Sequence, residues 1–449
     1  MSATENSTSK DTNALSLNAQ IAPVSEETRE AYRAPVAFAD IWQANQYLFP
    51  LIEHTPLVYS RDLSALTGAK IHLKFEQMQR GGSFKVRGAT YKMSRLSEEQ
   101  RKAGVITASA GNHAQGVAIA AASYGIPCTI VVPENASLTK VTATQSYGAK
   151  VVLAGATYDD AVQHCVEMQK ELGATGPTYI PAFDDIDVVT GQGTLGLEML
   201  NEVPSADAIV VPIGGGGLIA GIAIAARAMK PSIKIIGVEA DGAASMRASI
   251  RAGKLITLPA LATIADGIAI KQPGKVTFPI IQHLVDDVVL VTDEQIIHAA
   301  LFLMEKHKIL VEGAGASAVA ALMSGTLQLP DKEVLIPLTG GNIDTNLLGR
   351  FAEHGLINAN RHFALRASFP DRPGELARML NIIAAMRVNI IDVHYQHVSA
   401  QLPFMQHEAM ITLETRNRAQ CEELLQVLRA AGFAVEEAQA IQPVALPNS

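Results

Sequence analysis

The sequence predicts an α/β protein built on parallel sheets and followed by a smaller antiparallel unit. Short apolar runs typical of strands recur before residue 342, and helical patterns lie between several of them, which favours parallel pairing. These runs are residues 71–75, 104–107, 128–132, 150–153, 208–213, 233–238 and 333–338. After residue 342 the pattern becomes β-α-β-β-α-β, the order of a ferredoxin-like unit.

Composition excludes several classes of protein. The 449 residues are enough for two or three domains, and a net charge of −8 argues against a nucleic-acid partner. Although 48% of the residues are hydrophobic, no uninterrupted apolar run reaches the roughly 18 residues of a membrane span. Cys128, Cys165 and Cys421 are far apart, which is typical of reduced thiols in a cytoplasmic protein.

The N-terminal segment, residues 1–35, is expected to be a disordered leader. Residues 1–29 are rich in Ser, Thr, Asn and acids, and they lack the basic and apolar regions of a secretion signal. The folded part is therefore expected to begin near residue 36.

One lysine stands out in residues 81–89 (GGSFKVRGA), where Lys85 follows glycines, a hydroxyl and an aromatic ring just before a predicted helix. A lysine amine can form a Schiff base with an aldehyde once its pKa is lowered. Burial and the charge of Arg87 are expected to lower it. The alternative is a solvated loop lysine.

A second segment, residues 107–116 (TASAGNHAQG), lies between a predicted strand and an Ala-rich helix. The free N–H groups and positive dipole end of such a helix make an anion site. Asn112 adds an amide that could contact a ring hydroxyl. The alternative is that Ser109 and Asn112 only cap the helix.

A third segment runs from a hydrophobic strand into four glycines, residues 214–217, and then into an apolar helix. We expect these glycines to have no packing role and to let backbone amides surround a phosphate. Gly215, Gly217 and Ala220 also satisfy a relaxed dinucleotide fingerprint, with Glu239 where a ribose-binding acid would lie. A nicotinamide oxidoreductase therefore remains an alternative.

Four ordered motifs resemble the pyridoxal-phosphate enzymes of the tryptophan synthase β family, also called fold type II. They are residues 83–85 (SFK), 109–113 (SAGNH), 214–218 (GGGGL) and 337–342 (PLTGGN), and within that family the chain resembles the threonine ammonia-lyases. The resemblance implies two parallel-sheet α/β domains within a catalytic region, residues 36–350. A small subdomain, about residues 83–185, would border the cofactor cleft.

The resemblance also implies roles for individual residues. Lys85 would be the catalytic residue and hold the cofactor, pyridoxal 5′-phosphate, as a Schiff base. The cofactor-binding residues would be Phe84, Lys85, Asn112, Gly214, Gly215, Gly216, Gly217, Leu218 and Thr339, with Thr339 facing the pyridine nitrogen. The substrate carboxylate would lie on the amides of Ser109, Ala110, Gly111, Asn112 and His113.

The implied reaction is β-elimination from L-threonine to give 2-oxobutanoate and ammonia, with weaker deamination of serine. Serine dehydratase or racemase and threonine or cysteine synthase are the alternatives within the family. Ala110 stands where serine racemases carry a second serine, so weak racemisation is expected. Glu239 and Ala243 match a divalent-ion site of those racemases, but Ser245 replaces its second acid. No metal ligand is assigned, and a monovalent ion near Glu239 stays open.

The last region, residues 361–440, resembles an ACT domain, the amino-acid-sensing module of metabolic enzymes. The resemblance depends on the β-α-β-β-α-β order and on residues 371–375 (DRPGE), where Pro373 suits the first turn of a helix. It implies an amino-acid effector and a homo-oligomer, a dimer or tetramer; the alternative is a unit that only dimerises. His394, His397 and His407 lack a matching acid or thiol set and are interpreted as packing or solvated residues.

Overall fold

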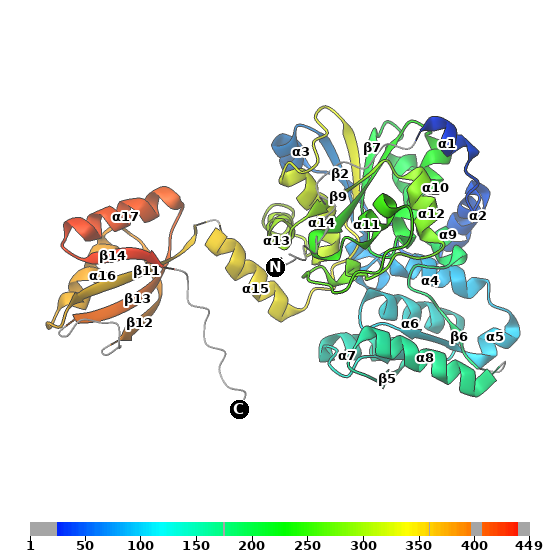
Figure 1. The fold of residues 1–449 in the computed structure, drawn as a ribbon, viewed down its shortest axis with the longest axis horizontal. Helices are drawn as coiled ribbons and strands as arrows, with labels where there is room; N and C mark the ends of the chain where they lie inside the picture. The colour runs from blue at the N-terminus through cyan, green and yellow to red at the C-terminus, as the bar shows by residue number, and fades with distance from the viewer. Residues whose placement is uncertain (1–24, 174–175, 359, 397–405, 439–449) are drawn as a thin grey trace, which may run out of the picture. The chain divides into compact units, whose positions relative to one another are not determined.

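The computed structural model describes residues 25–173, 176–358, 360–396 and 406–438. The chain forms two compact units, Met1–Ile343 and Asp344–Ser449, and the division falls close to the boundary expected near residue 350. Each unit has its own sheet layers, which Figure 1 shows by residue colour.

The first unit contains a six-stranded sheet in the order β1-β2-β10-β7-β8-β9. The strands are β1 Leu57–Tyr59, β2 Lys70–Lys74, β7 Ala208–Pro212, β8 Lys234–Ala240, β9 Asp287–Val291 and β10 Glu333–Pro337. All neighbours pair in parallel except β1, which is antiparallel to β2 at one edge. Every residue of β7 is buried, as the continuous apolar run of a strand covered on both faces predicts.

A second sheet of four parallel strands, in the order β5-β4-β3-β6, forms the small subdomain. Its strands are β3 Val105–Ala108, β4 Cys128–Val132, β5 Lys150–Leu153 and β6 Thr178–Tyr179. Helices α6 Asn112–Tyr124, α7 Leu138–Ser146 and α8 Tyr158–Leu172 flank it, in cyan and teal in Figure 1. The predicted parallel α/β architecture is confirmed in both sheets.

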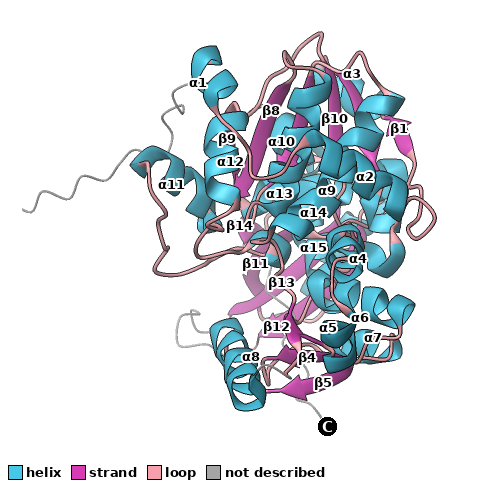
Figure 2. Cartoon of the chain, turned by 90° about the vertical axis from the view of Figure 1, so that its right-hand side faces the viewer, coloured by secondary structure: helices cyan, strands magenta, loops and turns pink. Residues whose placement is uncertain are grey.

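Helices cover both faces of the larger sheet, as Figures 1 and 2 show. They include α2 Phe38–Leu48, α4 Lys85–Ser94, α9 Ile186–Glu202, α10 Gly217–Met229, α11 Ser245–Ala252, α12 Thr277–Leu284, α13 Asp293–Phe302 and α14 Gly313–Met323. Glycines let α9 and α10 pack closely: a Cβ at Gly221 would lie 2.3 Å from the carbonyl oxygen of Val189.

The first helix begins earlier in the chain than the sequence analysis predicts. Residues 1–24 lie outside the described residues, but Glu26–Ala31 form helix α1 within the expected leader. Arg29 pairs with Asp286 at 2.7 Å, and the Tyr32 ring stacks on His283 with centroids 4.2 Å apart. The expectation of disorder through residue 35 is therefore wrong for this helix, because its side chains bind distant residues.

The second unit has the predicted ferredoxin-like order. After helix α15 Thr345–Asn358, its elements are β11 His362–Pro370, α16 Glu375–Ala385, β12 Asn389–Gln396, β13 Gln406–Glu414, α17 Arg418–Ala430 and β14 Ala434–Ala438. The strands form an antiparallel sheet in the order β12-β13-β11-β14. Alternate residues of β11, from Phe363 to Phe369, are buried against the helices.

Three strands were not predicted. β1 and β6 have three and two residues, too short to show a pattern, and the apolar run of β9 was overlooked. Helix α13 begins with a capping box, in which Thr292 and Gln295 bond each other's backbone N–H groups. Within the described ranges, no helix combines the length and apolar character that crossing a membrane requires.

Candidate active site

A cavity of about 730 Å³ opens in the first unit beside the carboxyl ends of strands from both sheets. Every residue that the sequence predicted for cofactor or substrate binding lines it: Phe84, Lys85, Ser109, Ala110, Gly111, Asn112, His113, Gly214, Gly215, Gly216, Gly217, Leu218 and Thr339. The fold thus brings four separate motifs to one place. We call this cavity the Lys85 pocket.

Lys85 is the first residue of α4, and its amine lies inside the Lys85 pocket. Nζ donates to the carbonyl oxygen of Ala182 at 3.1 Å and lies 5.2 Å from the centre of the Phe84 ring. Burial lowers the pKa of this amine to about 8, although the charge of Glu312 acts in the opposite direction. The solvated-loop alternative is therefore wrong.

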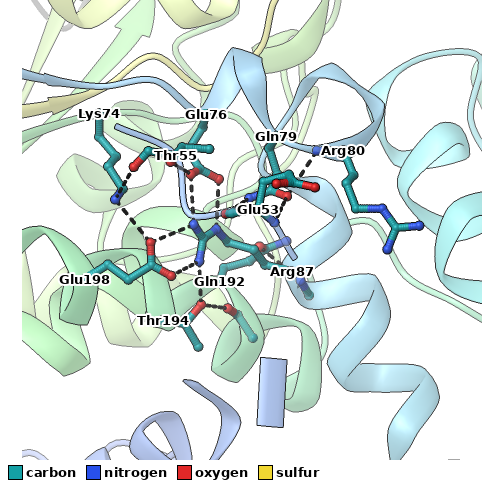
Figure 3. A network of polar contacts seen from close by, with 12 residues as sticks. Glu53, Thr55, Lys74, Glu76, Gln79, Arg80, Arg87, Gln192, Thr194 and Glu198 are labelled. Carbon is teal, nitrogen blue, oxygen red and sulfur yellow. Dashed lines mark hydrogen bonds and ion pairs between the residues drawn. The ribbon is translucent and has the colours of Figure 1, made fainter. Parts of the chain in front are cut away.

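Arg87 does not act on Lys85 as expected. It is fully buried on the other side of α4, and its five N–H donors make bonds of 2.6–3.2 Å to Glu76, Glu198 and Thr194, as Figure 3 shows. Although burial opposes the charge, these two carboxylates hold the pKa of Arg87 above its usual value. The low pKa of Lys85 therefore comes from burial, and the proposed effect of Arg87 is a wrong expectation.

The Arg87 cluster joins α4 to β2 and α9. It comprises Arg87, Glu76, Glu198, Lys74 and Glu202. Lys74 pairs with Glu198 at 3.2 Å and with Glu202 at 2.8 Å. Because each buried charge has an opposite charge beside it, the cluster can stay ionised inside the protein. It holds the helix whose first residue is Lys85.

The loop before α6 presents its backbone to the pocket. Gly111 is the N-cap residue and α6 has no side-chain cap, so the capping interpretation of Ser109 and Asn112 is wrong. The hydroxyl of Ser109 instead accepts from the Gly111 N–H at 3.1 Å. The ring of His113 bonds the carbonyl oxygen of Ile180 at 2.9 Å, and burial followed by the charge of Lys85 lowers its pKa to about 3. A neutral His113 leaves the helix N-terminus as the anion site.

The glycine loop has both a packing role and a binding role. A Cβ at Gly215 would lie 2.2 Å from the Phe183 ring, and Gly216 has a φ of +95° that favours glycine. The expectation that these glycines have no packing role is therefore wrong. The loop ends at the N-terminus of α10, which has no side-chain cap, and Thr277 Oγ1 donates to the Gly215 carbonyl oxygen at 2.6 Å. A phosphate fits the backbone N–H groups at this uncapped helix start.

Sequence reasoning missed Glu312, a buried acid that lines the pocket. Its Oε1 accepts from Asn112 Nδ2 at 2.6 Å. Burial, reinforced by the charge of Asp266, raises the pKa of Glu312 to about 7. The available signal was a single acid within the apolar, small-residue run of residues 309–323 (ILVEGAGASAVAALM).

Glu239 does not line the pocket within the described part of the chain. It is fully buried, and its two oxygens accept from the N–H groups of Met246 and Arg247 at 2.8 Å each. Burial raises the pKa of Glu239 to about 8, although these N–H groups oppose the shift. A ribose-binding role for this acid, which the nicotinamide alternative needs, has no support from this geometry.

Two of the three histidines noted in the sequence, His394 and His407, lie within the described residues and have separate partners. His394 pairs with Asp392 at 2.7 Å on an exposed surface, whereas His407 is buried and pairs with Asp371 at 3.3 Å. His407 also bonds the hydroxyl of Tyr395. His397 lies outside the described residues.

Comparison with known proteins gives consistent matches. Residues 48–340 match the family model of pyridoxal-phosphate dependent enzymes. The chain is 42% identical to the L-threonine ammonia-lyase of Thermotoga maritima, over 89% of this chain and 99% of that protein. It is 45% identical to the catabolic L-threonine dehydratase of Staphylococcus aureus, over 72% of this chain and 93% of that protein.

Solved structures agree with these sequence matches. A threonine deaminase isoform from Solanum lycopersicum superposes with a TM-score of 0.69 at 35% identity, covering 75% of this chain and 96% of that one. Maize serine racemase superposes with a TM-score of 0.67 at 37% identity, covering 72% of this chain and 99% of that one.

The pocket fits the group that the family description names. An aldehyde needs an amine of lowered pKa, which Lys85 supplies inside the cavity. A phosphate needs backbone N–H donors, which the uncapped start of α10 supplies. Asn112 lines the same cavity with a side-chain amide that can bond a ring oxygen.

Proposed function

Because this chain belongs to the family of pyridoxal-phosphate-dependent enzymes and, within it, to the L-threonine ammonia-lyases, we propose that it converts L-threonine to 2-oxobutanoate and ammonia. The observation that carries the proposal is the buried amine of Lys85, which shares one cavity with two uncapped helix N-termini. One terminus can hold the phosphate and the other the substrate carboxylate.

Each residue then has a physical task. When bound, pyridoxal phosphate supplies an aldehyde that condenses with amines and a ring that withdraws electrons from the substrate Cα. The Lys85 amine takes the proton from Cα, and a pKa of about 8 leaves part of it neutral near pH 7. The amides before α6 orient the carboxylate, and Thr339 supplies a neutral hydroxyl rather than a carboxylate at the pocket wall.

The atoms balance over the whole reaction. L-threonine loses its Cα proton and its β-hydroxyl, which together leave as water. Addition of water and release of ammonia then give 2-oxobutanoate. L-serine would lose the same groups to give pyruvate, and we propose this as the weaker activity.

The first experiment tests the cofactor and the reaction together. The purified protein is expected to be yellow, and borohydride reduction is expected to fix the cofactor on Lys85, as peptide mass spectrometry would show. L-threonine should yield equal amounts of ammonia and 2-oxobutanoate. A colourless protein that instead binds reduced nicotinamide would contradict the proposal.

Serine racemisation is the second candidate, because the chain also superposes on a serine racemase. Ala110 lines the pocket but has no hydroxyl that could exchange a proton with Cα. We therefore expect little D-serine from L-serine, and Ala110→Ser should increase it if the opposite face of the substrate is open. Chiral chromatography of the products measures both rates, and comparable rates in the unaltered protein would favour the racemase.

For the second unit we propose a regulatory role as an ACT-like domain. Two observations support it: the ferredoxin-like strand order, and the DRPGE segment, residues 371–375, between β11 and α16. The match to the T. maritima protein also covers more of the chain than the first unit, which ends at Ile343. An effector bound there must favour one conformational state by its differential affinity.

Threonine kinetics with and without added amino acids test this role. Isoleucine and valine are the first to try, because a branched-chain product is a natural signal at this step. The full-length protein is expected to shift its apparent threonine affinity by roughly 5- to 150-fold, the usual range of such couplings. A variant that ends at Ile343 should keep activity and lose the shift. A response that survives the truncation would place the sensor in the first unit.

We further propose that the protein is a cytoplasmic homo-oligomer, a dimer or tetramer. Its composition and the dispersed cysteines support this location. Light scattering at several concentrations would measure the assembly, and a monomer at all of them would contradict this part of the proposal.

A further inference from the structure

The side chain of Asn112 is held from two sides by residues to which the sequence assigned no role. Its Nδ2 donates to Glu312 Oε1 at 2.6 Å, and its Oδ1 accepts from Asn342 Nδ2 at 2.8 Å. Asn342 follows β10 and Glu312 precedes α14, so the three residues come from distant parts of the chain.

These two contacts define which way the amide of Asn112 points. If the amide were flipped, its NH₂ group would face the NH₂ donor of Asn342 and its oxygen would face the Glu312 carboxylate. Two NH₂ groups would then meet at Asn342, and the ionised form of Glu312 would repel the oxygen of Asn112. In the observed orientation, one N–H of Asn112 remains for a ligand in the Lys85 pocket.

Asn342 also connects this amide to the segment that precedes Lys85. Its Nδ2 donates to the Gly81 carbonyl oxygen at 2.7 Å as well as to Asn112. A Cβ at Gly82 would lie 2.6 Å from Asn342 Oδ1. The contact therefore needs the glycine, and it places Asn342 between the lysine segment and Asn112.

Glu312 is enclosed in a similar way. A Cβ at Gly340 would lie 2.4 Å from Glu312 Oε1 and 2.9 Å from Asn112 Nδ2. The glycine of the PLTGGN motif thus leaves room for the hydrogen-bonded pair. The charged groups that act on Glu312 are Asp266, Lys140 and Lys85.

We propose that Glu312 and Asn342 are positioning residues that orient the amide of Asn112 toward a ring oxygen of bound pyridoxal phosphate. The inference rests on the proposed function, because it requires that cofactor in the Lys85 pocket. Both residues act through Asn112, so their effect on cofactor binding must disappear when the Asn112 amide is removed.

A double-mutant cycle on cofactor affinity tests this dependence. The affinity of cofactor-free protein for pyridoxal phosphate is measured by fluorescence titration for Asn112→Ala, Glu312→Ala, Asn342→Ala and the two double variants that contain Asn112→Ala. Glu312→Ala is expected to weaken binding about tenfold or more, in line with a hydrogen bond to a charged group. In the Asn112→Ala background, Glu312→Ala should weaken binding of pyridoxal phosphate by less than about twofold, because the amide through which Glu312 acts is already absent. Independent sites would instead show the same loss in both backgrounds.

Two controls keep the result specific. Glu312→Gln retains an oxygen that can accept from Asn112, so it should recover most of the affinity. If Glu312→Ala does not fold, the cycle of Asn342→Ala with Asn112→Ala carries the test, because Asn342 makes the other hydrogen bond to the Asn112 amide. Glu333→Gln makes the same chemical change at the far end of β10, where Glu333 pairs with His72, and should leave affinity unchanged. Circular dichroism checks the fold of each variant.

The outcomes separate the inference from the proposed function. Equal losses from Glu312→Ala with and without Asn112 would show that Glu312 acts independently, and they would overturn the inference. An unaltered protein that binds pyridoxal phosphate and forms 2-oxobutanoate would still support the proposed function in that case. An unaltered protein that binds no pyridoxal phosphate would overturn both.

Discussion

The Lys85 pocket and the Arg87 cluster lie on opposite sides of α4 and use buried charge in opposite ways. In the Arg87 cluster, all five donors of one guanidinium meet acceptors. In the Lys85 pocket, the amine donates to a backbone carbonyl, that of Ala182, and the pocket provides the open space around it. Residues two apart on a helix point about 200° away from each other, so adjacent motif positions reach different environments.

The comparison shows that burial has no single effect on a cation. Where carboxylates compensate it, as at Arg87, the charged form is stabilised and the pKa rises. Where burial dominates, as at Lys85, the pKa falls and more of the amine is neutral, the form that the proposed nucleophile and base requires. We therefore expect substitutions in the Lys85 pocket to affect the reaction, and substitutions in the Arg87 cluster to affect the free energy of unfolding.

The largest expected effect is on catalysis. Lys85→Ala should lower kcat/KM by about 10²–10⁴-fold or more, because it removes the proposed general base together with the attachment point of the cofactor. The free energy of unfolding of the cofactor-free protein should be unchanged or higher, since a poorly compensated buried amine is lost. Steady-state kinetics and urea unfolding measure the two quantities. If Lys85→Ala instead lowered the free energy of unfolding strongly, Lys85 would stabilise the fold as Arg87 is expected to, and the contrast between the two regions would be wrong.

The next effect is on stability. Arg87→Met should lower the free energy of unfolding by about 3–5 kcal/mol, because it leaves Glu76 buried without its cation and Glu198 with Lys74 alone. The matched control is Arg418→Met, since Arg418 pairs with Glu437 at 2.8 Å on the surface and such pairs contribute about 1 kcal/mol or less. Denaturant unfolding measures both changes. Equal losses would mean that burial of the Arg87 cluster is not what matters.

The third effect is a pH dependence. The rate at which cofactor-free protein reacts with pyridoxal phosphate should rise through an inflection near pH 8, against 10.5 for an ordinary lysine. Between these two values the unfolded chain binds a proton that the folded chain does not, so the contribution of Lys85 to stability rises with pH and is lost as pH falls through 8. Stopped-flow absorbance and unfolding at several pH values measure both. An inflection near pH 10 would contradict the effect of burial.

The smallest effect concerns the edge of the Arg87 cluster. Glu202 pairs with Lys74 at 2.8 Å, but its side chain is 46% exposed, whereas that of Glu198 is 8% exposed. Glu202→Gln should therefore lower the free energy of unfolding by about 1 kcal/mol or less, because water solvates an exposed carboxylate and weakens its ion pair. Urea unfolding at low and high salt measures the change. If Glu202→Gln lowered the free energy of unfolding as much as Arg87→Met does, the exposed Glu202 would contribute to stability like the buried members of the cluster, contrary to this prediction.

Much of the candidate site could be predicted because its residues belong to short contiguous motifs. Lys85, Asn112 and the glycines of residues 214–217 each lie at the junction of a loop and a helix N-terminus. Parallel strands bring such junctions to one edge of the sheet, so a correct order of elements also places the site. The roles of individual side chains are a separate matter, and Arg87 shows why: its partners Glu76 and Glu198 lie 11 and 111 residues away.

By itself, the sequence determined the parallel and ferredoxin-like units, most of their strands, and the motifs that line the pocket, but not β1, β6 and β9. These are local properties, because periodicity, glycine and capping residues act over one turn or one strand. Only the tertiary structure decided that Glu312 and Asn342 hold Asn112, that Phe183 packs on the glycine loop, and that Lys85 and Arg87 differ in pKa. Each depends on atoms that the folded chain brings together, and burial and partner charges exist only after folding.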